Sequence, residues 1–434
     1  MTENEKRQRP VRKLTVKNFS VIKEAELEFG KITVLIGPQA SGKSLLCKLA
    51  YFLQYEVVIA AVDAIKVGLS WKDFETLIAI RFSQWFHFES WKFDTFLINV
   101  QLNRYSVILK RTTENEKQLL TLETSSEFKE FYLQLVQPSS SQQLNLRAEE
   151  RFVAALNGFI SLQSSNELIS PIYIPAGRAF FTNNLGSAVM QNPLLDPLVR
   201  RFNAEIVWNP SNWMPGLLAS SRQEFYAIST LMDKIAGGAV IVQGNEPAFK
   251  PFNREPLPFS ALSSGTQELL PLFNLLNRLV YLYESSYLAL RAKNAPKGFD
   301  QRPWVYVEEP EVHIFPKTQY EVVQLFSWLA NDPILNFSWV ITTHSPYILS
   351  AFNNLIFAGQ LGQDEKLKKK IKIDEKYWIE PGSFKAYSVH DGKTESILSE
   401  SGLINGEYLD SVSETIAGEF DQLLRLEYGK QKAS

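Results

Sequence analysis

The stretch that decides the fold reads Ile32-Thr33-Val34-Leu35-Ile36-Gly37-Pro38-Gln39-Ala40-Ser41-Gly42-Lys43-Ser44. Its first five residues are apolar or β-branched and predict a buried strand. A loop bounded by two glycines follows, and the run from Leu45 to Ala50 then predicts a helix. In this order, the N–H groups of the loop and of the helix N-terminus point at an anion, which is the arrangement of a phosphate-binding P-loop.

Two residues at the end of this loop carry specific chemistry. Lys43 places a positive charge where the β- and γ-phosphates of a nucleotide lie, and Ser44 offers a hydroxyl to Mg²⁺. The glycine-lysine-serine spacing alone could arise by chance in a long chain. The apolar strand before it and the helix after it support the P-loop, so the sequence predicts that Gly37 to Ser44 bind a nucleotide.

The bulk composition is that of a globular protein without a marked charge bias. The 434 residues carry a formal net charge of −2, and no basic or acidic tail stands out. The one cysteine, Cys47, cannot form an internal disulfide, which fits a reducing compartment. Residues 1–12 are unlike a secretory signal, and no uninterrupted apolar run reaches the roughly 18–20 residues that span a bilayer. We expect a soluble, cytoplasmic protein.

Two adjacent carboxylates follow a second predicted buried strand, Trp304 to Val307. In an α/β sheet, ligands bind at the carboxyl ends of the strands. Glu308 can there hold Mg²⁺, directly or through water, and Glu309 can orient and deprotonate an attacking water. An ordinary strand-to-loop junction with solvated acids is the alternative.

A third predicted buried strand, Trp339 to Thr342, ends in a polar cluster that contains His344. A single histidine in such a place is often structural. Because this strand should neighbour the strand of Glu309, however, His344 is placed to hydrogen-bond a γ-phosphate and to sense its loss.

A serine-rich turn opens the long helix predicted over residues 267–291. Ser263, Ser264 and Gly265 lie at the helix N-terminus, which by geometry is another anion site. The alternative is a routine cap, with Ser264 and Gln267 at the spacing of a capping box. The two interpretations are compatible, because spare N–H groups face outward.

Together, these four elements resemble the ATP-binding cassette (ABC) superfamily. Gly37 to Ser44 look like its Walker A motif, Leu262 to Gln267 its signature motif, Val305 to Glu309 its Walker B motif and His344 its switch histidine, in the same order. The resemblance implies an α/β fold: an ABC-type P-loop NTPase head with a mixed β-sheet and an inserted, mostly helical subdomain.

The same resemblance implies the activity and the assembly. We expect hydrolysis of ATP with Mg²⁺ in a head-to-tail dimer, where Ser263 and Gly265 of one protomer close on the γ-phosphate held by the other. Glu309 would be the catalytic base, and His344, as the switch histidine, would be the second catalytic residue. Glu308 stands where the family usually has aspartate, which leaves its metal role less firmly implied than that of Ser44.

Two features resemble the prokaryotic ATPases akin to the overcoming-lysogenization-defect and RecF-like proteins. One is the sequence Glu308-Glu309-Pro310-Glu311-Val312-His313 together with Thr343-His344-Ser345-Pro346. The other is the signature Ser263-Ser264-Gly265-Thr266-Gln267, which replaces a double-glycine signature. About ninety residues follow His344, rather few for the toprim nuclease domain of the first group. The nuclease is therefore expected in another chain.

The chain accordingly looks like the stand-alone ATPase subunit of an anti-phage defence system such as PARIS or Septu. This resemblance implies a homo-oligomer, a separately encoded effector such as a nuclease, and a phage protein as trigger. Two alternatives stay open: a RecF-like repair ATPase that acts on DNA, and a scaffold in which ATP only holds the oligomer together. The densest basic run, residues 366–372, fits a solvated face or a DNA contact.

The order of the predicted elements suggests four domains. These are an N-terminal ATPase lobe with the P-loop (1–50), an inserted helical and β-hairpin subdomain (51–170), a C-terminal ATPase lobe with signature, Walker B and switch histidine (171–358), and an α/β tail (359–434). A helix is predicted over residues 71–85 with Ser70 as its cap, and a β-hairpin over residues 95–111. Residues 170–178 predict a short buried strand that ends in a Pro-Ala-Gly turn and delivers Arg178. Helices are also expected over residues 148–162 and within 404–429, and the aromatic-rich segment 71–96 is expected to form mostly core.

Overall fold

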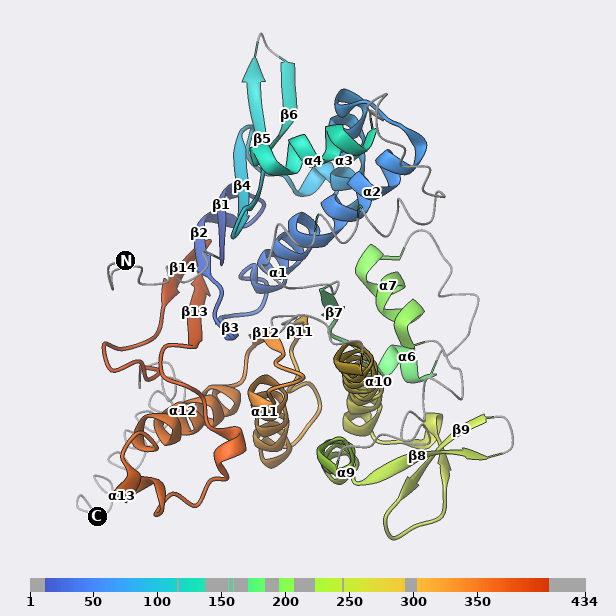
Figure 1. Cartoon of the computed structure of the whole chain (residues 1–434), viewed down its shortest axis with the longest axis vertical. Helices are drawn as coiled ribbons and strands as arrows, with labels where there is room; N and C mark the ends of the chain where they lie inside the picture. The colour runs from blue at the N-terminus through green and yellow to red at the C-terminus, as the bar shows by residue number, and fades with distance from the viewer. Residues whose placement is uncertain are drawn as a thin grey trace, which may run out of the picture.

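The computed structural model describes residues 12–114, 117–136, 155, 159, 171–183, 195–206, 223–243, 246–292 and 303–405. The helices expected over residues 148–162 and within 404–429 lie almost entirely outside these ranges. Figure 1 shows one large sheet running through the described part of the chain, with helices on both of its faces.

In the described residues, eleven strands form this sheet in the order β6-β5-β4-β1-β2-β14-β13-β3-β12-β11-β7. Their bounds are β1 Arg12–Phe19, β2 Ile22–Glu28, β3 Ile32–Ile36, β4 Phe96–Leu102, β5 Tyr105–Glu114, β6 Lys117–Thr124, β7 Ile172–Ile174, β11 Trp304–Glu308, β12 Ser338–Thr343, β13 Phe384–His390 and β14 Lys393–Ser396. A smaller sheet contains β8 Gly238–Gln243, β9 Glu246–Pro251 and β10 Leu257–Pro258. The expected mixed α/β fold is confirmed.

The strands that position the site are parallel. β3 pairs with β13 on one side and with β12 on the other, and β11 pairs in turn with β12 and β7. β11 and β12 are buried along their whole length, as expected for near-continuous apolar runs in a parallel sheet that is covered on both faces. The carboxyl ends of β3, β11 and β12 therefore meet at one edge.

Alternate residues of β11 enter two separate cores. Trp304 and Tyr306 pack into the first core, whereas Val305 and Val307 pack into the second. This is the two-residue period of a strand with both faces buried. The sheet thus holds the two layers of helices together.

The first layer covers one face with helices that follow the P-loop. Its helices are α1 Lys43–Tyr51, the π-helical turn η1 Phe52–Glu56, α2 Val57–Val67, α3 Trp71–Trp85, the short η2 Phe88–Ser90 and α4 Ser126–Val136. The continuous helical stretch from Lys43 to Val67 is apolar and long enough to span a bilayer, but 78% of its most apolar window is buried inside the structure.

The second layer is built by the later helices. These and the neighbouring short helices are α6 Ala179–Asn183, α7 Pro197–Ile206, α9 Gln223–Ala236, η5 Phe259–Ala261, α10 Ser264–Ala292, α11 Pro316–Asn331, α12 Pro346–Leu361, α13 Glu365–Lys368 and η6 Glu375–Tyr377.

Most elements predicted from local patterns are present with nearly the same bounds. Helix α3 has the predicted range and cap, because the Ser70 hydroxyl accepts a hydrogen bond from the Asp73 N–H (3.2 Å). The hairpin predicted over 95–111 is formed by β4 and β5. In the aromatic-rich segment, Phe86 and Trp91 are buried as expected, whereas Phe88 is 58% exposed.

Strands from all four segments that were expected as domains join the large sheet. β13, from the segment expected as a tail, pairs with the P-loop strand β3, and β4, from the segment expected as an insertion, pairs with β1. The four segments therefore share one sheet, and their division into domains stays a prediction.

Candidate functional site

The P-loop connects β3 to α1 at the edge of the sheet, and two of its glycines are required by geometry. A Cβ on Gly37 would lie 2.2 Å from the carbonyl oxygen of Val389 on β13, so only glycine fits against that strand. Gly42 has φ +105°, in the region that favours glycine, and precedes the first residue of α1. The loop is thus held in place by its neighbours before any ligand binds.

Lys43 lies under this loop rather than in solvent. Its Nζ donates hydrogen bonds to the carbonyl oxygens of Gly37 (2.9 Å) and Pro38 (2.8 Å), and the residue is 4% exposed. Burial lowers the pKa of Lys43, and the negative charges of Glu309 and Glu311 oppose that effect. A buried cation held by backbone oxygens is well suited to meet an anionic ligand.

Glu309 and His344 lie together at the carboxyl ends of β11 and β12. His344 Nε2 is 3.2 Å from Glu309 Oε1, and both side chains are about one-third exposed. The backbone of Glu309 has φ +42°, an unusual value for this residue type, and its N–H donates to the carbonyl oxygen of Thr342 (2.9 Å). The strand end is therefore fixed in a conformation that turns Glu309 toward His344.

One cavity of about 420 Å³ brings these predicted residues together. It is lined by residues 39–44 of the P-loop, by Glu309 and by His344. Gly37 and Pro38 are not in its lining, but their carbonyl groups hold Lys43. The volume lies within the range of small-ligand sites, and polar groups converge on it from three strand ends.

Glu308 faces a different direction from Glu309. Its two carboxylate oxygens accept hydrogen bonds from the hydroxyl of Tyr173 (2.6 Å) and from the N–H of Ala176 (3.1 Å), and the residue is 7% exposed. Among the described residues, Glu308 is not part of the cavity lining that contains Ser44.

The serine-rich turn opens α10, which begins at Ser264. The predicted capping box at Ser264 and Gln267 is wrong by one residue: the Ser263 hydroxyl accepts from the Thr266 N–H (3.3 Å) and lies 2.9 Å from the Thr266 hydroxyl. The Gln267 amide instead donates to the carbonyl of Phe259. The shift leaves Ser264 exposed at the first helical position.

Gly265 lies close to the loop that follows β11. A Cβ at this position would be 2.6 Å from the carbonyl oxygen of His313, so the serine-rich turn and the loop after β11 are in direct contact. In the described part of the chain, Ser263, Ser264 and Gly265 do not line the cavity that holds the P-loop of the same chain.

Arg178 connects these parts, a role that the sequence did not reveal. It is 1% exposed, and its guanidinium donates to the carbonyl oxygens of Glu308 (2.7 Å) and Glu309 (3.0 Å). Its backbone N–H donates to the carboxylate of Glu268 on α10 (2.9 Å). The Pro-Ala-Gly turn before Arg178 was visible as a strand end that delivers an arginine, but its partners are distant in sequence.

Glu311 is a second residue whose role was missed. One oxygen of its carboxylate accepts from the Thr343 hydroxyl (2.8 Å) and from the His344 N–H (2.6 Å). The other oxygen is buried and has no hydrogen-bond partner in the described residues. Burial raises the pKa of Glu311. This carboxylate therefore fixes the backbone of His344 beside the cavity.

The residues present fit a nucleotide with Mg²⁺. The hydroxyl of Ser41 in the P-loop is buried and has no hydrogen-bond partner among the described residues, as expected of a group that contacts a ligand. The described residues contain no group of three or more His, Cys, Asp or Glu side chains that could hold a metal by themselves. Mg²⁺ does not require such a cage, because it is usually held by one or two protein oxygens together with phosphates and water.

Comparison with solved structures finds similar ATPase heads at low sequence identity. The SMC head domain from Thermotoga maritima has 13% identity and a TM-score of 0.37, with 91% of this chain and 100% of that chain covered. An ATP-binding cassette of an ABC transporter, MJ1267, has 11% identity and a TM-score of 0.31, with 91% and 93% covered. No curated protein matched the sequence.

The sequence also matches a protein family, described as AAA ATPase domain, over residues 10–156 and 206–349. The second stretch includes the serine-rich turn at the start of α10, the carboxyl ends of β11 and β12, and His344. Because the two stretches make up more than half of the chain, the protein belongs to the AAA ATPase domain family and is an ATPase of the P-loop class.

Proposed function

We propose that this ATPase works through ATP-dependent association of two copies of the chain, in which each copy completes the nucleotide site of the other. The observation that carries the proposal is the separation of the motifs within one chain. Lys43, Glu309 and His344 line one cavity, whereas Ser263 to Gly265 lie outside it at the start of α10. A helix N-terminus left outside its own site is available to phosphates bound elsewhere.

Each site residue then has a role in hydrolysis. The loop from Gly37 to Ser44 binds the phosphates, with Lys43 as the positive charge beside them. Glu309 orients and deprotonates the attacking water, and its neighbour His344 contacts the γ-phosphate. From the second copy, Ser263, Ser264 and Gly265 close on the same phosphate.

Mg²⁺ would supply charge neutralisation on the phosphates when bound. We assign Ser44 and Glu308 to hold it. Ser44 lines the cavity with the other P-loop residues, and its hydroxyl is the type of oxygen that Mg²⁺ prefers. Glu308 is assigned through water, because both of its oxygens already accept hydrogen bonds within the chain.

A mixing experiment tests the shared site. Lys43→Ala removes the positive charge that binds the phosphates, and Ser264→Arg blocks the exposed start of α10. Each variant alone should therefore be inactive. In a mixed dimer, one of the two sites combines an intact P-loop with an intact signature turn, and ATPase activity should return. The matched control mixes Lys43→Ala with Glu309→Gln. Each copy then carries one change in its own P-loop cavity. Neither of the two sites is intact, and activity should stay absent.

The mixing result distinguishes a site shared between two copies from a site completed within one chain. Return of activity in the first mixture but not in the control supports a site shared between copies. Full activity of Ser264→Arg alone shows that the signature turn takes no part in hydrolysis and contradicts the proposal. Normal ATP binding and normal turnover of Lys43→Ala would show that the P-loop assignment is wrong.

At the level of biology, we propose a subunit of a cytoplasmic, prokaryotic anti-phage defence complex. Association of the ATP-bound heads would hold a separately encoded effector such as a nuclease, and a phage protein would trigger its release. The resemblance of residues 308–313, 343–346 and 263–267 to the overcoming-lysogenization-defect and RecF-like group supports this proposal. Its test is to express the chain with the product of each adjacent reading frame and to co-purify them with and without ATP.

The purified proteins also distinguish the defence role from a repair ATPase and from a scaffold, when ATP turnover with DNA and oligomer size are measured. An ATP-sensitive complex with a neighbouring nuclease supports the defence role. ATP turnover stimulated by DNA ends, without such a complex, supports a RecF-like repair ATPase. The exposed lysines Lys366, Lys369 and Lys370 would be the first to neutralise in that case. Slow turnover with nucleotide-dependent oligomer size, and no partner, supports a scaffold.

A further inference from the structure

The cavity of the P-loop has a second wall that neither the motifs nor the proposed function explains. This wall comes from the end of α3 and the segment that follows it, and consists of Trp85, Phe86, His87 and Ser90. Trp85, Phe86 and His87 bring aromatic rings to the cavity lining, in addition to His344. The wall therefore offers flat, apolar surface opposite a loop built to bind phosphates.

The position of Trp85 is set by α1, the helix that the P-loop opens. Its indole stacks on the ring of Tyr51 (centroids 6.1 Å apart, 25° between planes) and meets Phe52 edge-on (5.4 Å). Tyr51 lies eight residues after Lys43, which corresponds to about 12 Å along an α-helix. The indole is thus held beside the helix, well away from the buried end of Lys43.

The turn that carries His87 is fixed by packing of its neighbour Phe86 and by a hydrogen bond from Ser90. Phe86 is 5% exposed, and its ring packs against Phe19, Phe52 and Phe82. The Ser90 hydroxyl donates to the carbonyl oxygen of His87 (2.7 Å). His87 itself is exposed. A fixed backbone with an exposed ring is the condition for stacking a ligand at low entropic cost.

We propose that Trp85 and His87 form the nucleobase end of the nucleotide site and hold the base by stacking. This inference rests on the proposed role of the P-loop, which would place the phosphates at the other wall. A nucleobase is planar and aromatic, and aromatic side chains bind such rings face to face. The cavity volume of about 420 Å³ suits a ligand of this size.

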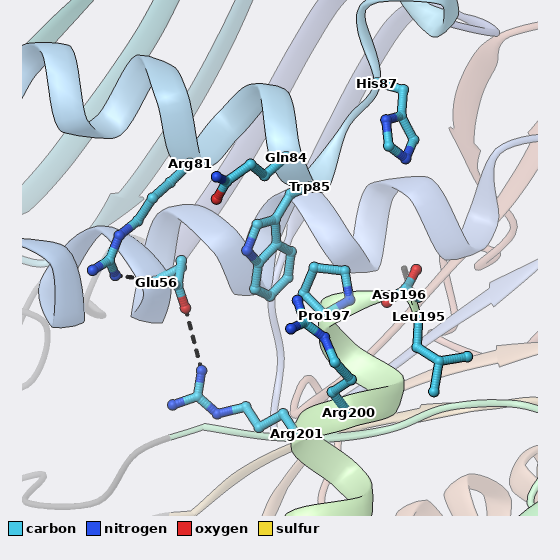
Figure 2. A pocket seen from close by; sticks show the side chains of 10 residues that line it. All are labelled: Glu56, Arg81, Gln84, Trp85, His87, Leu195, Asp196, Pro197, Arg200 and Arg201. Atoms are coloured by element: carbon cyan, nitrogen blue, oxygen red, sulfur yellow. Dashed lines mark hydrogen bonds and ion pairs between the residues drawn. The ribbon is translucent and has the colours of Figure 1, made fainter. Parts of the chain in front are cut away.

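The surroundings of the two rings also indicate how selective the site is. Trp85 and His87 line a second, larger cavity of about 990 Å³, which continues to the start of α7 at Pro197. Figure 2 shows Trp85 extending from α3 toward that helix and His87 on the segment beyond the end of α3. The outer edge of a stacked base therefore faces this wide cavity, whose described lining includes polar side chains such as Gln84 and Arg200 but does not enclose the base. Stacking is then the main contact, and because it tolerates every base, ATP and GTP should bind within a few-fold of each other.

The test compares two probes on the full-length protein with Mg²⁺: ATP, and inorganic tripolyphosphate, which has the phosphates but neither base nor ribose. Titration calorimetry gives both dissociation constants. His87→Ala and Trp85→Ala should each weaken ATP binding about tenfold, since stacking on one aromatic ring is worth that order of affinity. Tripolyphosphate binding should not change. Trp85→Phe and His87→Tyr keep a ring and should restore most of the ATP affinity.

Phe88→Ala is the matched control, because Phe88 is an exposed aromatic residue of the same segment that lines neither cavity. It should leave both constants unchanged. Unchanged ATP affinity in both alanine variants overturns the inference, as does a parallel loss of tripolyphosphate affinity, which would mean that the wall only supports the P-loop. A GTP affinity far below that of ATP would contradict the inference that the outer edge of the stacked base is not enclosed. Failure of the proposed function itself is seen separately, as unaltered binding of both probes by Lys43→Ala.

Discussion

His344 Nε2 lies 3.2 Å from Glu309 Oε1, where two parallel strands end side by side. In the strand register, Glu308 of β11 lies opposite Thr342 of β12, so Glu309 lies one residue and His344 two residues beyond this pair. The left-handed backbone at Glu309 and the hydrogen bond that the His344 N–H donates to the Glu311 carboxylate fix the backbones of both residues. The pair is therefore a product of the sheet register rather than of a flexible loop.

Glu309→Gln should bind ATP normally and hydrolyse it about 10²- to 10⁴-fold more slowly, because the amide cannot take a proton from the attacking water. His344→Ala should also slow turnover. Since the two side chains contact each other, their effects should be strongly non-additive in the double variant. Steady-state turnover and a separate measurement of ATP binding check both expectations.

The control for charge removal is Glu365→Gln, an exposed acid in the first turn of α13 that is not part of the site. Its turnover should equal that of the unmodified protein. Normal turnover of Glu309→Gln would exclude Glu309 as the base, and additive effects in the double variant would mean that the contact with His344 has no catalytic importance.

Arg178→Lys should destabilise the fold by about 2–5 kcal/mol, because each buried acceptor that is left without a donor costs about 1–3 kcal/mol. The change leaves the backbone carbonyl oxygens of Glu268, Glu308 and Glu309 without their planar donor, which an ammonium group cannot replace. Urea unfolding followed by circular dichroism measures the loss. Arg104→Ala, in the exposed turn between β4 and β5, should change the free energy of unfolding by less than about 0.5 kcal/mol. A stable Arg178→Lys protein would show that the network is dispensable.

The parts of the structure that were predicted from sequence are those encoded by neighbouring residues. The P-loop between a strand and a helix, the cap at Ser70 and the β4–β5 hairpin all depend on patterns shorter than about twenty residues. The one-residue error at the α10 cap has the same origin. Ser263 and Ser264 are equally good caps by composition, and only the geometry of the preceding turn decides between them.

The parts that were not predicted depend on contacts across the whole chain. β13 inserts beside the P-loop strand, with Phe384 opposite Ile32, although some 350 residues separate them. The arginine of the Pro-Ala-Gly turn finds its partners on β11 and α10. Local patterns of hydrophobicity indicate that a strand is buried, but they do not indicate which strand lies next to it.

Gly37→Ala should disrupt the P-loop, because the new methyl group would lie 2.2 Å from the backbone of Val389 and one of the two segments must move. We expect a clear loss of nucleotide affinity together with a lower melting temperature. Gly68→Ala provides the contrast. Gly68 has φ +73° but no atom within 4 Å of a new Cβ, so only the backbone strain of about 1–2 kcal/mol applies.

Nucleotide titration and thermal unfolding of both glycine variants distinguish the two causes. Gly68→Ala should lower stability modestly and leave nucleotide affinity unchanged, since it lies at the end of α2, outside the cavity lining. Equal effects of the two substitutions on nucleotide affinity would mean that the contact between Gly37 and β13 does not shape the P-loop.

Asp233→Asn should stabilise the protein at neutral pH. Burial on α9 raises the pKa of Asp233 from 3.8 to about 6, so the folded state favours the protonated form. The stability that this group contributes is complete below about pH 3.8 and is lost as the pH rises through 6, because the carboxyl must then ionise in a buried place. Asparagine resembles the neutral acid at every pH. The melting temperature of Asp233→Asn should therefore exceed that of the unmodified protein at pH 8 and approach it at pH 4, and an equal difference at both values would show that ionisation of Asp233 is not the cause.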